Sequence, residues 1–381
     1  MRKAREIRDN VNTPDSSPSG RPGGAFMKIL IIQQKMIGDV LTSSILFEAL
    51  RKKYPDAELH YLIYPHTKPV VENNPFIDKI IEYAPGIGKN PIKFLKFLSF
   101  IRNESYSVII DIYSKISSGI IASYSGASIR LGFQKNYTRV FYTQTFTYKE
   151  KPETKGGLAI ENRMQVLKGL DQEFPKELKP KIYISSEEKE TFRKKLLKQG
   201  IRIDQPMIMC GVLGSSTMKS YPGNYMASLL DELVKHIPNA QILFNYLPFQ
   251  YTEAKNIYNQ CNPGTQSQIF LNIYESSLKG FILNAANCDL YFGNEGGAAN
   301  IMKALEIPTF SIHSPIVKKN YWAIYEDDKK HVSIHLEDFQ PLLFKSCPSK
   351  FSKQKNAALY QNLNPELIKL KLSEFFKNLE I

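Results

Sequence analysis

The chain alternates between short apolar runs and longer segments in which apolar positions recur every three or four residues. Such short runs are typical of strands buried on both faces of a parallel sheet, and the longer segments are typical of helices that cover it. We predict strands at residues 28–32, 59–63, 80–83, 108–111, 129–133, 206–212, 241–244, 290–292 and 308–312. We predict helices at residues 40–50, 91–102, 161–167, 187–199, 225–236, 278–285, 298–305 and 365–378. This alternation indicates βαβ units.

The alternation starts anew after a Pro- and Lys-rich stretch at residues 175–182, which we interpret as a linker. A chain of 381 residues also exceeds the usual size of one core. We therefore predict a bilobal α/β protein with an interdomain cleft, formed by residues 27–174 and 183–362. Residues 1–26 lack the hydrophobic segment of a signal peptide, and we interpret them as a disordered extension or a cloning remnant.

Charge and composition restrict the class of partner. The formal net charge of +13 favours acidic partners, which include nucleic acid, anionic lipid head groups and phosphorylated sugars. No nucleic-acid-binding motif is present, so we predict no nucleic acid partner. The four cysteines and six histidines form no metal-ligand pattern, which favours a reducing cytoplasm without a metal site. No apolar stretch is long enough to cross a membrane, so a membrane role would be peripheral.

Gly296 and Gly297 lie in a predicted turn between a strand and a helix. Without Cβ atoms they allow the backbone to approach an anion, and the first amides of the following helix favour negative charge. The alternative is that the pair only forms the turn. A similar choice applies to Asp39, where a strand passes into a helix: it either caps the helix or faces a ligand. Lys219, in a loop at residues 213–222, is either a surface lysine or an anion contact.

Three segments together resemble one family, the ADP-heptose:lipopolysaccharide heptosyltransferases of glycosyltransferase family 9. They are the Ile-Gly-Asp-Val-Leu stretch at residues 37–41, the lysine-containing loop at residues 214–222 and the segment at residues 294–308. The resemblance covers about residues 27–315. It implies the GT-B architecture, in which two Rossmann-like lobes bind the acceptor (N-terminal lobe) and the donor (C-terminal lobe). It also implies inversion at the anomeric carbon, no metal and no cofactor, and a C-terminal helix, residues 363–381, that packs back towards the N-terminal lobe.

Matching the family's motifs to this chain gives each site residue an implied role. Asp39 matches the aspartate thought to be the general base, and Lys219 matches the lysine that neutralises the donor phosphates. Glu295 stands where the family has Asp, and Asn300 where it usually has His, so contacts to the donor would differ. The remaining implied donor contacts are Ser216, Thr217, Gly296, Gly297 and Ala298, and the expected acceptor contacts are Lys35, Lys135, Arg139 and Arg163. The residue that contacts the nucleoside stays open between Gln250 and Glu253.

The resemblance implies an enzyme that transfers heptose from ADP-heptose to a lipopolysaccharide inner core or a related anionic glycolipid. Such an enzyme would be cytoplasmic and peripheral to the inner membrane. Two alternatives keep the fold: a family member with another nucleotide sugar and acceptor, and a catalytically silent relative that binds nucleotide or glycolipid. A third alternative is a basic protein that binds nucleic acid, which would show steeply salt-dependent binding.

Overall fold

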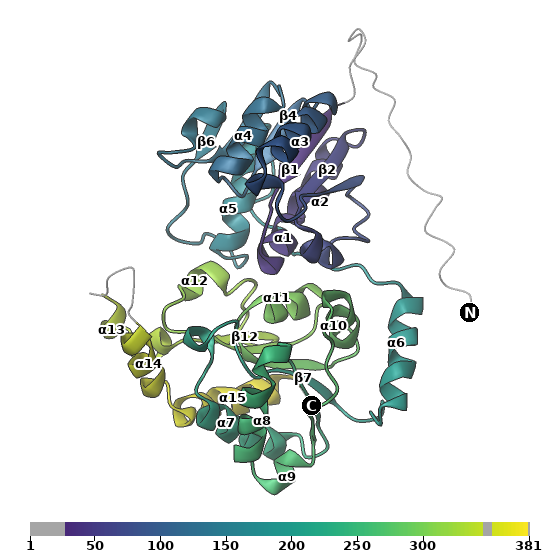
Figure 1. Ribbon diagram of the computed structural model, residues 1–381. Helices are drawn as coiled ribbons and strands as arrows, with labels where there is room; N and C mark the ends of the chain where they lie inside the picture. Colours follow the sequence, from purple (N-terminus) through teal and green to yellow (C-terminus); the bar gives the residue numbers. More distant parts are fainter. Residues whose placement is uncertain (1–26, 346–352, 380–381) are drawn as a thin grey trace, which may run out of the picture.

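The computed structural model describes residues 27–345 and 353–379, which form two α/β lobes (Figure 1). The first lobe is built on a parallel sheet with the strand order β3-β2-β1-β4-β5-β6. Its strands are β1 (Lys28–Ile32), β2 (Glu58–Ile63), β3 (Lys79–Glu82), β4 (Val108–Asp111), β5 (Ile129–Phe133) and β6 (Gln144–Phe146). Its helices are α1 (Ile37–Ser43), α2 (Ile45–Lys53), α3 (Pro91–Asn103), α4 (Ile116–Tyr124) and α5 (Leu158–Val166). Short 3-10 turns include η2 (Ile87–Lys89) and η3 (Arg139–Phe141).

The second lobe repeats the plan with the parallel order β12-β11-β10-β7-β8-β9. Its strands are β7 (Met207–Gly211), β8 (Gln241–Phe244), β9 (Ile269–Phe270), β10 (Leu290–Asn294), β11 (Thr309–Ile312) and β12 (His331–Ile334). Its longer helices are α6 (Ser186–Lys198), α7 (Gly223–His236), α8 (Tyr251–Gln260), α10 (Leu278–Ala285), α11 (Gly297–Ala304), α14 (Lys353–Asn362) and α15 (Pro365–Leu379). Shorter ones are α9 (Pro263–Gln266), α12 (Lys319–Trp322), α13 (Leu342–Lys345), η5 (Thr217–Lys219) and η6 (Pro248–Gln250).

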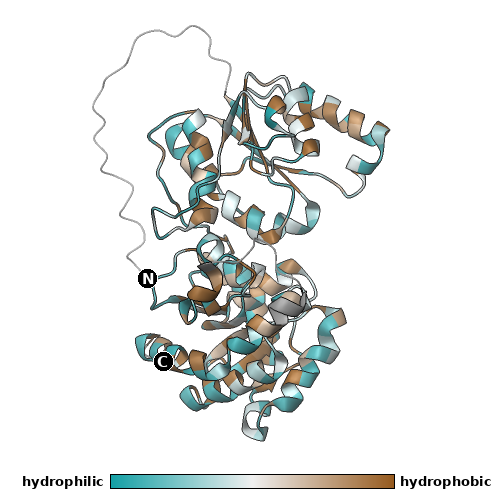
Figure 2. Ribbon diagram, turned by 90° about the vertical axis from the view of Figure 1, so that its left-hand side faces the viewer, coloured by the Kyte–Doolittle hydropathy of each residue, from teal (hydrophilic) through white to brown (hydrophobic). Residues whose placement is uncertain are grey.

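The central strands are buried on both faces, as their unbroken apolar sequences predict. Hydrophobic colour follows the strands through the middle of each lobe, and the helices outside them carry both colours (Figure 2). One buried cluster crosses from lobe to lobe, because Val40 and Ile160 belong to the same cluster as Ala299 and Ile324. The lobes therefore share apolar packing. Among the helices of the described residues, none has both the length and the apolar character of a membrane span.

The predicted helix at residues 40–50 is in fact two helices, α1 and α2, which meet at Ser44. The hydroxyl groups of Thr42, Ser43 and Ser44 each donate to a backbone carbonyl three or four residues earlier, at 2.8, 2.8 and 2.7 Å. Such bonds compete with the helical ladder, which explains the break. We did not predict the strands β6, β9 and β12, the helices α4, α8 and α14, or the short helices α9, α12 and α13. Residues 1–26 lie outside the described residues, and the proposed domain limits remain predictions.

The C-terminal helix α15 does not pack as we expected. Its apolar stripe lies against α7 and the second sheet: the ring of Phe375 is 5.4 Å from that of Phe310, and the ring of Phe376 is 5.2 Å from that of His236. Ile368 and Leu372 extend the same stripe into the core of the C-terminal lobe. The apolar face of α15 is therefore buried entirely within the C-terminal lobe. The expectation that it packs towards the N-terminal lobe was wrong.

Candidate active site

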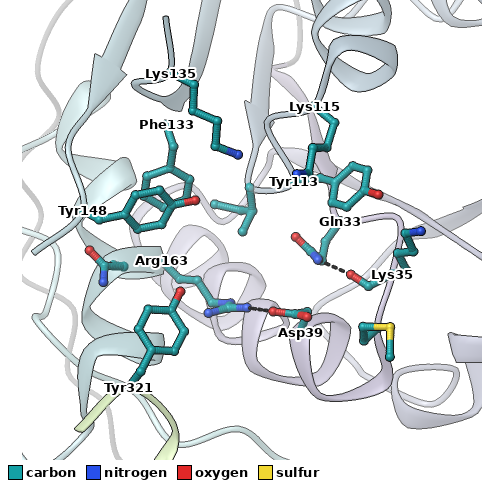
Figure 3. Close-up of a pocket in the computed structure, with 13 residues that line it drawn as sticks. Gln33, Lys35, Asp39, Tyr113, Lys115, Phe133, Lys135, Tyr148, Arg163 and Tyr321 are labelled. Carbon is teal, nitrogen blue, oxygen red and sulfur yellow. Dashed lines mark hydrogen bonds and ion pairs between the residues drawn. The ribbon is translucent and has the colours of Figure 1, made fainter. Parts of the chain in front are cut away.

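A pocket of about 440 Å³ opens at the carboxyl ends of β1, β4 and β5 (Figure 3). Ligands of open α/β sheets bind at this edge. Asp39, on the first turn of α1, lies on its floor with Arg163 of α5. Tyr321 comes from α12 of the other lobe, so both lobes line the pocket. The other lining residues are Gln33, Lys35, Met36, Ile112, Tyr113, Lys115, Phe133, Lys135, Tyr148 and Asn162.

Asp39 is held by a buried arginine. Arg163 Nη2 donates to Asp39 Oδ1 at 2.7 Å, and the two side chains are 4% and 27% exposed. Arg163 is fixed in turn, because its Nε donates to Ser43 Oγ at 2.8 Å and its Nη1 to Ala159 O at 2.6 Å. Asp39 does not cap the helix, since the cap position belongs to Met36. One carboxylate oxygen is therefore oriented while the side chain stays open to the pocket.

Two lysines and an aromatic pair form the upper wall of the pocket. Lys115 and Lys135 extend towards it in Figure 3. Burial lowers the pKa of Lys135, and the charge of Lys115 lowers that pKa further. The rings of Phe133 and Tyr148 stack with their centroids 4.1 Å apart. The pocket is thus cationic, with a flat aromatic surface on one side.

Sequence reasoning missed a buried amide at this pocket. Asn162 Oδ1 accepts hydrogen bonds from Lys149 N and Gln165 Nε2, both at 2.8 Å, which leaves its Nδ2 without a partner. A buried donor without a partner costs free energy that a ligand could recover. Of the expected acceptor contacts, Lys35, Lys135 and Arg163 line the pocket. Arg139 is exposed on η3 and is not among the lining residues.

The glycine turn joins β10 to α11 on the C-terminal lobe. Gly296 has φ = +155°, which residues with side chains rarely adopt. Just before it, the buried Asn294 accepts from Tyr221 N at 2.7 Å and donates to Gly211 O and Val212 O at 2.9 and 3.0 Å. Asn294 therefore ties the loop after β7 to the end of β10. No pattern in the sequence indicates this role, since the asparagine simply ends an apolar strand.

The same loop brings Lys219 near the glycine turn. Ser216 O accepts from Lys219 N at 2.9 Å, and a Cβ at Gly214 would lie 2.3 Å from Lys219 O, so the loop is tight. Burial raises the pKa of Glu295, and the charges of Lys219 and Lys303 oppose that rise. Ser216 and Thr217 are exposed beside Lys219. The structure thus brings together Lys219 and the Glu295–Ala298 turn.

The two candidate regions meet across the lobe interface. The start of α1 faces the start of α11 (Figure 1). A Cβ on Gly38 would lie 3.1 Å from Asn300 Nδ2, and one on Gly297 would lie 3.8 Å from Ile37 Cβ. Asn300 itself is buried. The pocket around Asp39 therefore adjoins the turn that precedes α11.

Neither candidate for the nucleoside contact gains a clear advantage. The buried Gln250 uses its Oε1 to accept from Leu247 N and its Nε2 to donate to Gly214 O, both at 2.9 Å. Its side-chain amide thus holds the loop at residues 213–222, which carries Lys219. Glu253 lies exposed in the first turn of α8. Within residues 27–345 and 353–379, no three His, Cys, Asp or Glu side chains are arranged to hold a metal ion.

Two parallel sheets of this plan, with facing sites at their carboxyl edges, define a GT-B type α/β protein. The model of glycosyltransferase family 9 (heptosyltransferase) matches residues 94–350, and the chain belongs to this family. Asp39 lies outside that match. Lipopolysaccharide heptosyltransferase 1 of Campylobacter coli is 27% identical over 294 residues, 75% of this chain and 83% of that protein.

Solved structures show the same fold. The ADP-heptose lipopolysaccharide heptosyltransferase II of E. coli has a TM-score of 0.65 at 17% identity, covering 93% of this chain and 100% of that one. A family 9 glycosyl transferase from Veillonella parvula has a TM-score of 0.66 at 16% identity, covering 88% and 97%. The predicted family and GT-B architecture are therefore confirmed.

Proposed function

We propose that this enzyme is an inverting glycosyltransferase that moves heptose from ADP-heptose to a lipopolysaccharide inner core or a related glycolipid. Family membership supports the reaction class, and the name of the Campylobacter relative supports the sugar and the acceptor. The observation that carries the proposal is the placement of Asp39 in a pocket that adjoins the glycine turn. We also propose a cytoplasmic enzyme, peripheral to the inner membrane.

In this proposal Asp39 is the general base. An aspartate carboxylate at this position can take the proton of an acceptor hydroxyl. The hydroxyl oxygen then bonds to the anomeric carbon, and the bond from that carbon to the phosphate oxygen breaks, its electron pair leaving with the nucleoside diphosphate. Because Arg163 holds Oδ1, the other oxygen is the one left to accept the proton. Such assistance contributes about 10²–10⁴ in rate.

The donor diphosphate is proposed to lie on the C-terminal lobe. Lys219 supplies a positive charge, and the first amides of α11, at Gly297 and Ala298, lack intrahelical partners. Both would stabilise the charge that develops on the leaving group. Ser216, Thr217 and Glu295 complete the proposed donor contacts. Asn300 is neutral, so its contact with the donor would be a hydrogen bond without ionic character.

The pocket around Asp39 is proposed to receive the acceptor. Lys35, Lys115 and Lys135 favour an anionic sugar, and Asn162 Nδ2 offers a buried donor. We withdraw Arg139 from the proposed contacts because it is exposed outside the pocket. Arg163 acts instead through Asp39.

The test measures nucleotide release from ADP-, UDP-, GDP- and CMP-sugars with a deacylated inner-core acceptor. We expect ADP release from ADP-heptose, reduced by about 10²-fold or more in Asp39→Asn because the amide cannot take the proton. Asp204→Asn, an exposed aspartate of the C-terminal lobe, is the matched control and should keep full activity.

Other outcomes would redirect the proposal. Asn300 and Glu295 replace the residues expected for the family, which favours another donor as the second candidate. Turnover with only another nucleotide sugar, still lost in Asp39→Asn, would move the donor and keep the mechanism. Nucleotide binding without turnover of any sugar would support a catalytically silent relative.

A further inference from the structure

The outer surface of the N-terminal lobe is strongly cationic between residues 87 and 148. This stretch holds eight lysines or arginines and two carboxylates. Neither carboxylate offsets the exposed charge: Asp111 is fully buried, and Glu104 pairs with Lys28 and Lys79 at 2.6 and 2.7 Å. The charge that this surface presents to solvent is therefore positive.

The helix α3 in this stretch exposes apolar side chains on the face opposite its core. Leu98 and Ile101 are buried beneath it, whereas Ile92 and Leu95 are 66% and 58% exposed. Lys93 and Lys96 are exposed on the same outer side. A single exposed leucine needs no explanation, but apolar residues interleaved with lysines along one outward face are typical of helices that lie on membranes.

The pattern continues along the neighbouring elements. α4 packs against α3 and η3 packs against α4. Ile116, at the start of α4, and Val140, on η3, are both exposed large apolar residues. We call Ile92, Lys93, Leu95, Lys96, Ile116 and Val140 together the α3 surface.

The α3 surface adjoins the pocket around Asp39. Lys115, which precedes Ile116, lines that pocket, and so does Lys135, which lies shortly before η3. Lys115 and Lys135 both extend towards the pocket (Figure 3). A membrane in contact with the α3 surface would therefore lie next to the rim of the proposed acceptor pocket.

We propose that the α3 surface docks this enzyme on a leaflet that contains anionic lipid. Ile92 and Leu95 enter the boundary between head groups and acyl chains, and Lys93 and Lys96 contact the lipid phosphates. The positive charge of the α3 surface favours an anionic membrane over a second copy of this chain, because a dimer through this surface would bring two positive surfaces together. The consequence for catalysis rests on the proposed function, because a glycolipid acceptor would then present its sugars beside Asp39.

The test is sedimentation with vesicles of phosphatidylcholine alone or mixed with phosphatidylglycerol, without donor or acceptor. We expect the wild type to sediment with the mixed vesicles only. Each lysine near an anionic surface adds about fivefold to binding, so Lys93→Gln/Lys96→Gln should bind about thirtyfold more weakly. Ile92→Ser/Leu95→Ser should lose about tenfold or more. Rising salt concentration should weaken vesicle binding by the wild type until it approaches that of Lys93→Gln/Lys96→Gln, because salt screens the lysine charges.

The matched control is Phe249→Ser/Leu370→Ser, which removes two exposed apolar residues of the C-terminal lobe, where Leu370 is 67% exposed between two lysines. It should bind like the wild type. Nucleotide release with the deacylated acceptor should be unchanged in every variant, which confirms folding and separates this proposal from the proposed function. The proposal would be overturned if the wild type does not sediment with the mixed vesicles. It would also be overturned if the control variant loses as much vesicle binding as the α3 variants. A wild-type dimer that Ile92→Ser/Leu95→Ser dissociates without changing vesicle binding would overturn it as well.

Discussion

At the scale of single residues, the pairing of Arg163 with Asp39 governs the candidate catalytic group. A buried guanidinium must be paired, and Arg163 uses its fork to bond Asp39, Ser43 and the carbonyl of Ala159 at once. Removing it would leave Asp39 without its partner and Ser43 and the carbonyl of Ala159 without their donor, which lowers stability. A conservative change therefore tests its role better than truncation.

Replacing Arg163 by lysine should lower kcat about tenfold to a hundredfold while the KM for the donor stays unchanged. A lysine keeps the charge but cannot form the fork, so the carboxylate loses its orientation, and small misplacements carry costs of this size. Steady-state kinetics with both substrates varied measure the split. Arg139→Lys is the matched control and should behave as wild type. If Arg163→Lys instead raises only the KM for the acceptor, Arg163 binds the acceptor, as the sequence first indicated.

Much of the residue-scale site follows from sequence because strand and helix junctions are visible in it. Asp39 and Gly296 each stand where a strand passes into a helix, and parallel sheets bind ligands there. The pairing of Asp39 with Arg163 spans 124 positions, and no local pattern carries such a contact. Asn162 and Asn294 also escaped prediction, because an amide in a helix or strand gives no sign of which backbone groups it will bond.

At the scale of elements, the junctions after β7 and β10 form one unit. The two strands are neighbours in the sheet, and Asn294 bonds the loop that carries Lys219. Tyr291 OH adds a bond to Asn294 O at 2.6 Å. The strand end that precedes Gly296 is therefore held by hydrogen bonds, and the unusual backbone angle of Gly296 lies in the turn directly after it.

Gly296→Ala and Gly297→Ala should differ, although the positions are adjacent. Gly296 has φ = +155°, so a Cβ there introduces strain of about 1–3 kcal/mol. Gly297 is helical, and its nearest neighbour would lie 3.8 Å away, so alanine fits and favours the helix. Urea unfolding should show loss of stability for Gly296→Ala and little change or a gain for Gly297→Ala. Equal losses would mean that the backbone angle is not what requires glycine.

The elements themselves were predictable where their pattern was strong. Continuous apolar runs identified the long central strands, since burial on both faces leaves little choice of residue. Strands β6 and β9 have only three and two residues, and β12 contains histidine and serine, so tertiary pairing rather than local preference creates them. The C-terminal helix was located correctly, but its partner came from analogy and was wrong.

At the scale of the whole molecule, the two lobes are joined by specific contacts. Tyr325 N donates to Lys155 O at 2.8 Å, and Lys279 Nζ bridges Glu72 and Glu188 at 2.5 and 2.7 Å. Tyr321 extends from α12 into the pocket of the opposite lobe. Burial raises the pKa of Tyr148, and the charge interaction with the Tyr321 hydroxyl raises that pKa further. The donor contacts are proposed on one lobe, whereas the acceptor pocket needs both.

This arrangement predicts that Tyr321→Ala weakens binding of the acceptor but not binding of the donor nucleotide. The KM for the acceptor should rise about tenfold, because the pocket loses its contribution from the C-terminal lobe, while the Kd for ADP should stay within about twofold. Calorimetry measures nucleotide binding, and initial rates at varied acceptor measure the KM. Tyr137→Ala, an exposed tyrosine that does not line the pocket, is the control and should change neither value. A comparable loss of ADP affinity in Tyr321→Ala would show that α12 serves the donor site, and the acceptor pocket would then belong to the N-terminal lobe alone.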